Sequence, residues 1–231
     1  MNKGFKGVLI FDIDGVLVDV SNSYRQAIAQ TTEYFTQQKV LSCEIQELKQ
    51  QTGFNNDWDL TEALIKKRGG NIEKQKIIEK FQDLYLGANG KEGLIANEKW
   101  MLDKEILVEL SKKYLIGIVT GRPREEAFIP LRKAGLEEYF RVVVAMEDCV
   151  GKSKPNPFGI NLALEKLGAK GTVIAYYIGD ALDDVRAAKS AGIIPIGSMP
   201  PGNSSIELKK KMRELGAVEV VNQVNEIVKV V

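Results

Sequence analysis

The sequence predicts an α/β fold: a Rossmann-like, doubly wound parallel sheet with an inserted α-helical domain. Short apolar segments recur along the chain and are typical of buried parallel strands, at residues 8–11, 115–119, 142–145, 173–178 and 193–196, and 218–221 is a candidate sixth strand. Segments of helical periodicity separate most of them, and this alternation favours a parallel sheet with helices on both faces.

Residues 21–99 interrupt the alternation. They contain amphipathic segments at 23–38, 43–51, 57–67 and 72–86, and no convincing strand. Four successive helices between the first two strands predict a separate helical domain, which returns through the Gly- and Asn-rich residues 86–98. The expected division is therefore residues 1–20 with 100–231 for the α/β core, and 21–99 for the insert.

One helix of the core carries an internal proline. The helix after residues 115–119 is expected to begin at Pro123 and to end before Gly135. Pro130 lies inside it, where the missing N–H predicts a kink or a split.

Composition excludes several kinds of chemistry and partner. The net charge is 32 − 31 = +1 with no long block of one sign, so neither nucleic acid nor a membrane surface is an expected partner. No apolar segment reaches transmembrane length, and residues 1–7 lead into a strand, so a cytoplasmic protein is expected. Cys43 and Cys149, the two cysteines, are expected to be unpaired thiols. The chain has no histidine, which rules out Ser-His-Asp and Cys-His catalysis and any zinc site built from histidine.

Polar residues follow four of the predicted strands. They are, in chain order, Asp12 and Asp14; Thr120, Gly121 and Arg122; Glu147, Asp148 and Lys154; and Asp180, Asp183 and Asp184. Ligands of an open parallel sheet bind beyond the carboxyl ends of the strands, so these groups are expected to converge. Clustered acids without histidine suit a hard cation, and Mg²⁺ usually keeps water and a substrate phosphate in its shell.

Four motifs at these strand ends resemble the haloacid dehalogenase-like (HAD) hydrolases. "DIDGVL", "VTGR", "KPNP" and "GDALDD" stand in the family's order, and the resemblance covers nearly the whole chain. The chain is most similar to the phosphoglycolate-phosphatase-like branch, in which a helical cap lies between the first two motifs. Residues 21–99 would be that cap.

The resemblance implies catalytic roles. Asp12 would be the nucleophile that forms an aspartyl phosphate, and Asp14 would protonate the leaving oxygen and then activate water. The Thr120 hydroxyl, the Gly121 N–H and Lys154 would hold phosphoryl oxygens. Lys152 competes with Lys154, but the family lysine directly precedes the proline.

The resemblance also implies an Mg²⁺ site and leaves some residues open. The ligands would be the Asp12 carboxylate, the Asp14 backbone carbonyl and Asp180. Asp184 would support the metal from its edge, and whether Asp183 does so as well is left open. Arg122 either touches substrate or closes a salt bridge, while Glu147 and Asp148 are expected to be loop residues.

The presence of Asp14 favours phosphate transfer over the other reactions of the family, because relatives that cleave carbon–halogen or C–P bonds lack an acid at this position. The expected function is hydrolysis of a small phosphorylated metabolite, with a phosphomutase as the alternative. Two alternatives from other classes are a receiver-like domain that only accepts phosphate and a binding protein that has lost catalysis.

The predicted cap would choose the substrate. Tyr24 and Arg25, at its start, either point into the cleft or are ordinary helix residues; Arg25 is the candidate substrate-binding residue of the two. The sequence gives no indication of oligomeric state.

Overall fold

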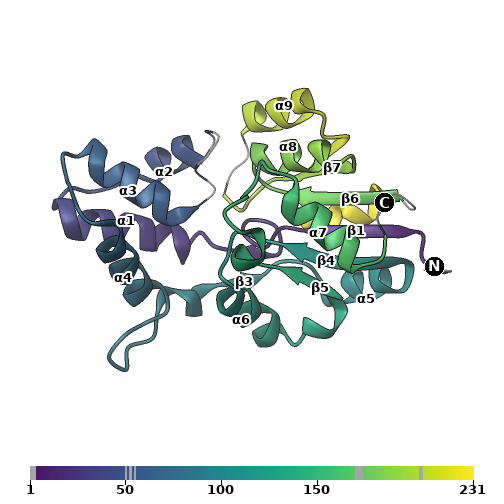
Figure 1. Cartoon of the computed structure of the whole chain (residues 1–231), viewed down its shortest axis with the longest axis horizontal. Helices are drawn as coiled ribbons and strands as arrows, with labels where there is room; N and C mark the ends of the chain where they lie inside the picture. The colour runs from purple at the N-terminus through teal and green to yellow at the C-terminus, as the bar shows by residue number, and fades with distance from the viewer. Residues whose placement is uncertain (1–3, 50, 52–53, 55, 170–173, 203–204) are drawn as a thin grey trace. The chain divides into compact units, whose positions relative to one another are not determined.

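The computed structural model describes residues 4–49, 51, 54, 56–169, 174–202 and 205–231. The chain divides into two compact units, Met1–Asp19 with Trp100–Val231, and Val20–Lys99 (Figure 1). The first is called the core unit below and the second the helical unit.

A six-stranded parallel sheet forms the centre of the core unit, in the order β5-β4-β1-β6-β7-β8. The strands are β1 (Gly7–Phe11), β4 (Tyr114–Val119), β5 (Val142–Val144), β6 (Ile174–Gly179), β7 (Ile194–Ser198) and β8 (Glu219–Val221). The sheet grows outward in both directions from the pair β1 and β6, in which Phe11 lies opposite Ile178. The crevice beyond this pair is where such sheets bind ligands.

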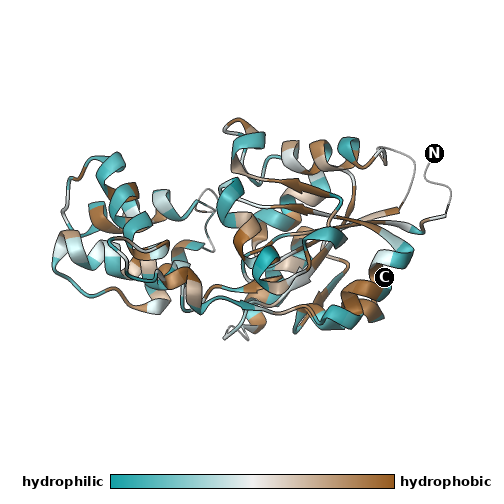
Figure 2. Ribbon diagram, turned by 90° about the horizontal axis from the view of Figure 1, so that it is seen from below, coloured by the Kyte–Doolittle hydropathy of each residue, from teal (hydrophilic) through white to brown (hydrophobic). Residues whose placement is uncertain are grey.

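Helices cover both faces of this sheet (Figure 1). They are α5 (Lys104–Lys113), α6 (Arg124–Ala134), α7 (Phe158–Lys166), α8 (Leu182–Ser190) and α9 (Ile206–Leu215), with short 3-10 helices at Glu137–Tyr139, Met146–Cys149 and Val224–Lys229. Ile160, Leu164 and Ala187 of α7 and α8 join one buried cluster with Val8 and Ile10 of β1. Figure 2 shows the hydrophobic colouring concentrated on the strands between these helices. Burial on both faces explains why the strands are continuous apolar segments.

The predicted fold class is confirmed, including the sixth strand, β8. Residue 173 of the predicted fourth strand lies outside the described residues. Two further short strands, β2 (Val18–Asp19) and β3 (Lys99–Trp100), form a separate two-stranded sheet that the sequence did not predict.

Pro130 does not split its helix. α6 runs from Arg124 to Ala134 with Pro130 inside, and Gly135 ends it in the left-handed conformation. Pro130 has no N–H for the carbonyl of Glu126, four residues earlier. That carbonyl accepts instead from Arg122 NH1 (3.4 Å), so the lost helical bond is replaced from outside the helix.

The helical unit consists of α1 (Tyr24–Thr36), α2 (Ser42–Lys49), α3 (Asp57–Lys67), α4 (Lys74–Tyr85) and a 3-10 turn at Leu94–Asn97. The four helices occupy the predicted segments. Residue 50 of the predicted segment 43–51 lies outside the described residues. Ile28, Leu60, Leu64 and Phe81 are fully buried between them. In the described residues, no helix is both long and apolar enough to cross a membrane.

Candidate active site

Asp12 follows β1 directly and is held by the backbone on both sides. Its N–H donates to the Ile178 carbonyl (2.9 Å), which extends the pairing with β6 by one residue. Its carboxylate Oδ1 accepts from the Ile13 N–H (2.8 Å). The residue is only 5% exposed, so its carboxylate is a fixed and largely desolvated group at the end of the central strand.

Lys154 joins two carboxylates that are far apart in the sequence. Its Nζ lies 2.8 Å from Asp12 Oδ2 and 2.6 Å from Asp184 Oδ1, with side-chain exposures of 6%, 8% and 1% for the three residues. Nζ also donates to the Tyr177 hydroxyl (3.0 Å), which lies 3.1 Å from the Val119 carbonyl. A buried ammonium is thus placed against the Asp12 carboxylate and surrounded by acceptors.

Three carboxylates could hold a metal ion. One oxygen each from Asp12, Asp180 and Asp184 lie within 4.8 Å of one another. Asp184 is fixed by a bond from the Ala181 N–H to Oδ2 (2.9 Å), whereas Asp183 pairs with Arg186 (2.9 Å). Asp184 is therefore the one of the two adjacent acids that lies in the cluster.

Two glycines allow this close approach. Gly15 has φ +72°, and a Cβ there would lie 2.1 Å from Asp180 Oδ2. A Cβ on Gly179 would lie 2.2 Å from the Asp184 Cβ. Three converging oxygens, partly buried and reached by no histidine or cysteine, fit a hard divalent cation.

The electrostatics of the pair Asp12–Lys154 are set by burial. Burial raises the pKa of Asp12 from 3.8 to about 7. The Lys154 ammonium opposes this rise, and the negative charges of Asp184 and Asp14 add to it. For Lys154, burial by itself lowers the pKa, but the Asp12 and Asp184 carboxylates outweigh it and hold the pKa well above its usual range. Lys154 is therefore cationic, and a cation at the acid cluster would favour loss of the Asp12 proton.

Thr120 and Gly121 follow β4. Thr120 is 2% exposed, and its Oγ1 accepts from the Arg122 N–H (3.1 Å). Because the oxygen accepts there, the hydroxyl hydrogen is left to donate to another group. Gly121 is exposed, which leaves its backbone accessible.

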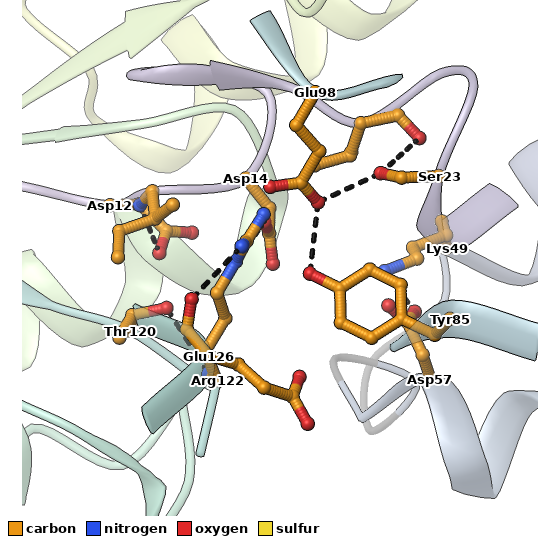
Figure 3. A network of polar contacts seen from close by, with 12 residues as sticks. Asp12, Asp14, Ser23, Lys49, Asp57, Tyr85, Glu98, Thr120, Arg122 and Glu126 are labelled. Carbon is orange, nitrogen blue, oxygen red and sulfur yellow. Dashed lines mark hydrogen bonds and ion pairs between the residues drawn. The ribbon is translucent and has the colours of Figure 1, made fainter. Parts of the chain in front are cut away.

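Arg122 closes a salt bridge, one of the two roles open from the sequence. Its Nε donates to Asp14 Oδ1 (2.8 Å), and its NH2 lies 2.6 Å from the same oxygen. Figure 3 shows the guanidinium directed at Asp14. The Arg122 side chain is completely buried, while that of Asp14 is 27% exposed. Asp14 thus keeps a solvent-accessible carboxylate with one oxygen held in place.

The other charged residues that follow β5, the third predicted strand, do not join the cluster around Asp12 and Lys154. Lys152 is exposed, with its Nζ 4.7 Å from the centre of the Phe158 ring. Glu147 accepts from the Arg124 N–H (3.0 Å), and Asp148 pairs with Arg124 and accepts from the Ala145 N–H (2.9 Å). Both acids were expected in a loop, but they lie in the short 3-10 helix Met146–Cys149, where both are tied to Arg124. Cys43 and Cys149 are free thiols.

In the helical unit, Tyr24 belongs to the core. It is 6% exposed and stacks on Tyr85 with ring centroids 4.1 Å apart. Nearby, the buried Glu98 accepts from Ser23 (2.8 Å) and from Tyr85 (2.9 Å), as Figure 3 shows. Arg25 is half-buried, and its side chain makes no hydrogen bond or ion pair within the part of the chain that the structure describes.

Sequence reasoning missed Tyr177. It lies within a predicted strand and was counted as an apolar strand residue. The available signal was that a buried tyrosine hydroxyl requires a partner.

The fold and this centre define an α/β protein with a carboxylate–lysine cluster at the switch point of its sheet, a class suited to phosphoryl chemistry. Residues 9–197 match the haloacid dehalogenase-like hydrolases, and the chain belongs to that family. The predicted resemblance is confirmed.

Individual relatives span most of the chain. An imidazoleglycerol-phosphate dehydratase of Phytophthora nicotianae is 36% identical over 84% of this chain but only 43% of its own length, so the chain spans less than half of that protein. A phosphorylated carbohydrates phosphatase of Thermotoga maritima is 32% identical, covering 92% of this chain and 93% of its own. The crystal structure of CbbY from Rhodobacter sphaeroides in complex with phosphate has a TM-score of 0.71 at 21% identity, with 96% of both chains covered, which shows a shared fold.

Proposed function

We propose that the protein is a Mg²⁺-dependent phosphatase that hydrolyses a small phosphate monoester through an aspartyl phosphate on Asp12. The observation that carries the proposal is the buried Lys154 bridging Asp12 and Asp184, beside Asp180. The phosphatase relative that covers nearly the whole chain supports the reaction class.

The first half-reaction transfers the phosphoryl group to the protein. An Asp12 carboxylate oxygen forms a bond to phosphorus, the bond to the leaving oxygen breaks, and Asp14 gives that oxygen a proton. The negative charge that Asp12 gives up passes to the leaving oxygen, where the proton from Asp14 neutralises it, and the Lys154 ammonium stabilises the phosphoryl oxygens during the transfer. The Thr120 hydroxyl and the Gly121 N–H donate to the same oxygens as charge develops.

The second half-reaction restores the protein. Water forms the new bond to phosphorus, its proton passes to the Asp14 carboxylate, and the bond to Asp12 breaks to release phosphate. Each residue thus returns to its starting protonation state.

The Mg²⁺ ligands would be the carboxylates of Asp12, Asp180 and Asp184, together with the Asp14 backbone carbonyl. When bound, Mg²⁺ supplies positive charge that offsets the repulsion between the carboxylates and the substrate phosphate.

The helical unit is proposed to be the cap that selects the substrate. Arg25 is its candidate contact, because a half-buried guanidinium with no partner among the residues that the structure describes can bind an anionic group of the ester. Arg25→Ala is expected to raise KM for the natural ester and to change turnover of p-nitrophenyl phosphate much less. Equal, deep loss on both substrates would instead place Arg25 at the phosphate itself, and no loss on either would remove it from the site.

Phosphate release from a panel of phosphorylated metabolites and p-nitrophenyl phosphate, with Mg²⁺ or EDTA, tests the function. Release with Mg²⁺ that EDTA abolishes is the expected result, and full activity in EDTA would reject the metal. Isomerised sugar phosphate without free phosphate would indicate a mutase. Absence of turnover on every compound would favour the receiver-like or binding-protein alternatives. Asp183→Asn is the matched control for changes in the acid cluster, because Asp183 pairs with Arg186.

A further inference from the structure

Arg122 is bound at both ends of its guanidinium. On one side, Nε and NH2 approach Asp14 Oδ1 at 2.8 and 2.6 Å. On the other side, NH1 donates to the Glu126 carbonyl at 3.4 Å. Complete burial of the side chain fixes the planar group, so it cannot turn toward another partner without leaving these contacts.

The carbonyl that receives NH1 is available because of Pro130. In an uninterrupted α-helix the N–H of residue 130 would bond to the Glu126 carbonyl. Pro130 has no such hydrogen, and a proline in the interior of a helix is otherwise destabilising. An unfavourable residue therefore stands where it leaves an acceptor for a buried arginine.

We propose that Arg122 is a positioning residue for Asp14, held in place by the acceptor that Pro130 leaves open. The inference rests on the proposed function, in which Asp14 is the general acid and base. Arg122 acts on the substrate only through Asp14.

The geometry selects the oxygen that carries the proton. Both Arg122 contacts to Asp14 fall on Oδ1, which leaves Oδ2 as the oxygen that exchanges a proton in the proposed reaction. Oδ2 gives this proton to the leaving oxygen in the first half-reaction and accepts one from water in the second. A carboxylate free to rotate would present either oxygen and lose this fixed geometry.

A double-mutant cycle tests the proposal. Arg122→Met is expected to lower turnover of an alkyl phosphate by about 10²-fold, the scale of a misplaced catalytic group, with KM changed less than about threefold. In an Asp14→Asn background the same change is expected to cost less than about threefold more, because Arg122 has no further route to the reaction. Turnover of p-nitrophenyl phosphate, whose leaving group needs little protonation, is expected to fall less. Arg124→Met is the control, since that arginine is two residues away and pairs with Asp148.

The outcomes separate the two claims. A further loss of about 10²-fold or a large rise in KM in the Asp14→Asn background would overturn the inference and place Arg122 on the substrate. If Asp14→Asn alone leaves turnover unchanged, the proposed function fails at Asp14, whatever Arg122 does. Circular dichroism and thermal melting of each variant establish that it is folded, and Arg122→Lys, which keeps the charge without the fork, is expected to recover part of the lost turnover.

Pro130→Ala provides an independent test, because a structural role and the positioning role predict opposite results. The new N–H competes with Arg122 for the Glu126 carbonyl, so turnover is expected to fall a fewfold while thermal stability rises. The fall should vanish in the Asp14→Asn background. Unchanged turnover in Pro130→Ala would overturn the part assigned to Pro130.

Discussion

Removal of Lys154 should damage both folding and catalysis. In Lys154→Ala, the Asp12 and Asp184 carboxylates, whose side chains are 8% and 1% exposed, lose their shared cation. Loss of one partner from a buried ion pair destabilises a protein by about 3–5 kcal/mol. At about 2–4 °C per kcal/mol for a chain of this size, the melting temperature should fall by roughly 6–20 °C.

The loss should depend on pH and on Mg²⁺. At acidic pH the two carboxyls take up protons instead of remaining as buried charges, so the stability difference between the variant and the native protein should shrink. At neutral pH, Mg²⁺ should stabilise the variant more than the native protein, because the acid cluster has lost the cation that competes with the metal for its charge.

Turnover should fall on the order of 10²–10³-fold, the usual cost of one preorganised electrostatic contact in the transition state. The assay pairs thermal melting in EDTA and in Mg²⁺ with phosphate release at saturating substrate. Lys152→Ala is the matched control, because its exposed ammonium contacts only the Phe158 ring among the described contacts and should contribute at most about 1 kcal/mol. A harmless Lys154→Ala together with a damaging Lys152→Ala would refute the reasoning.

Three further predictions follow from the same cluster. The pKa of Asp12 is about 7 in the folded state and 3.8 in the unfolded chain, so the metal-free protein should lose on the order of 4 kcal/mol of unfolding free energy as pH rises through this window. Denaturant titrations of the native protein and of Asp12→Asn at several pH values check this prediction. Equal slopes of unfolding free energy against pH for the two proteins would contradict it. Gly15→Ala should weaken Mg²⁺ binding at least tenfold by calorimetry, because its Cβ would strike Asp180, whereas Gly192→Ala, with φ +73° and no atom within 4 Å of a Cβ, should not. Tyr177→Phe should lower turnover about tenfold with KM nearly unchanged, since one hydrogen bond to the Lys154 ammonium is lost. Tyr176→Phe on the same strand is the control. An equal loss of turnover in both variants would contradict the role assigned to the Tyr177 hydroxyl.

The sequence predicted the parts of the fold that local pattern determines. Strands buried on both faces must be apolar throughout, so β1, β4 and β6 stood out as continuous segments. Because parallel strands end at one edge of the sheet, the positions of Asp12, Thr120 and Asp180 followed from the order of the motifs.

The remaining features depend on contacts between distant residues. Asp14 and Arg122 are 108 residues apart, and Asp12 and Lys154 are 142 apart, so no local periodicity could decide what each pairs with. A kink or a split was expected at Pro130; the helix is not split, and Arg122 supplies the hydrogen bond to the Glu126 carbonyl that the proline cannot make. Tyr177 was missed because its hydroxyl acts at the end of a side chain whose position in the sequence marks only a buried strand.

The central claim is that Asp12 carries the phosphoryl group, and an acid-quenched single turnover analysed by peptide mass spectrometry tests it most directly. The account predicts one added phosphoryl group on the peptide that contains Asp12, accumulating in Asp14→Asn and absent from Asp12→Asn. Water labelled with ¹⁸O should place its oxygen in the released phosphate, because the second step breaks the bond between phosphorus and Asp12. Substrate turnover by Asp12→Asn at a near-native rate, or a phosphoryl group found on another residue, would contradict the account.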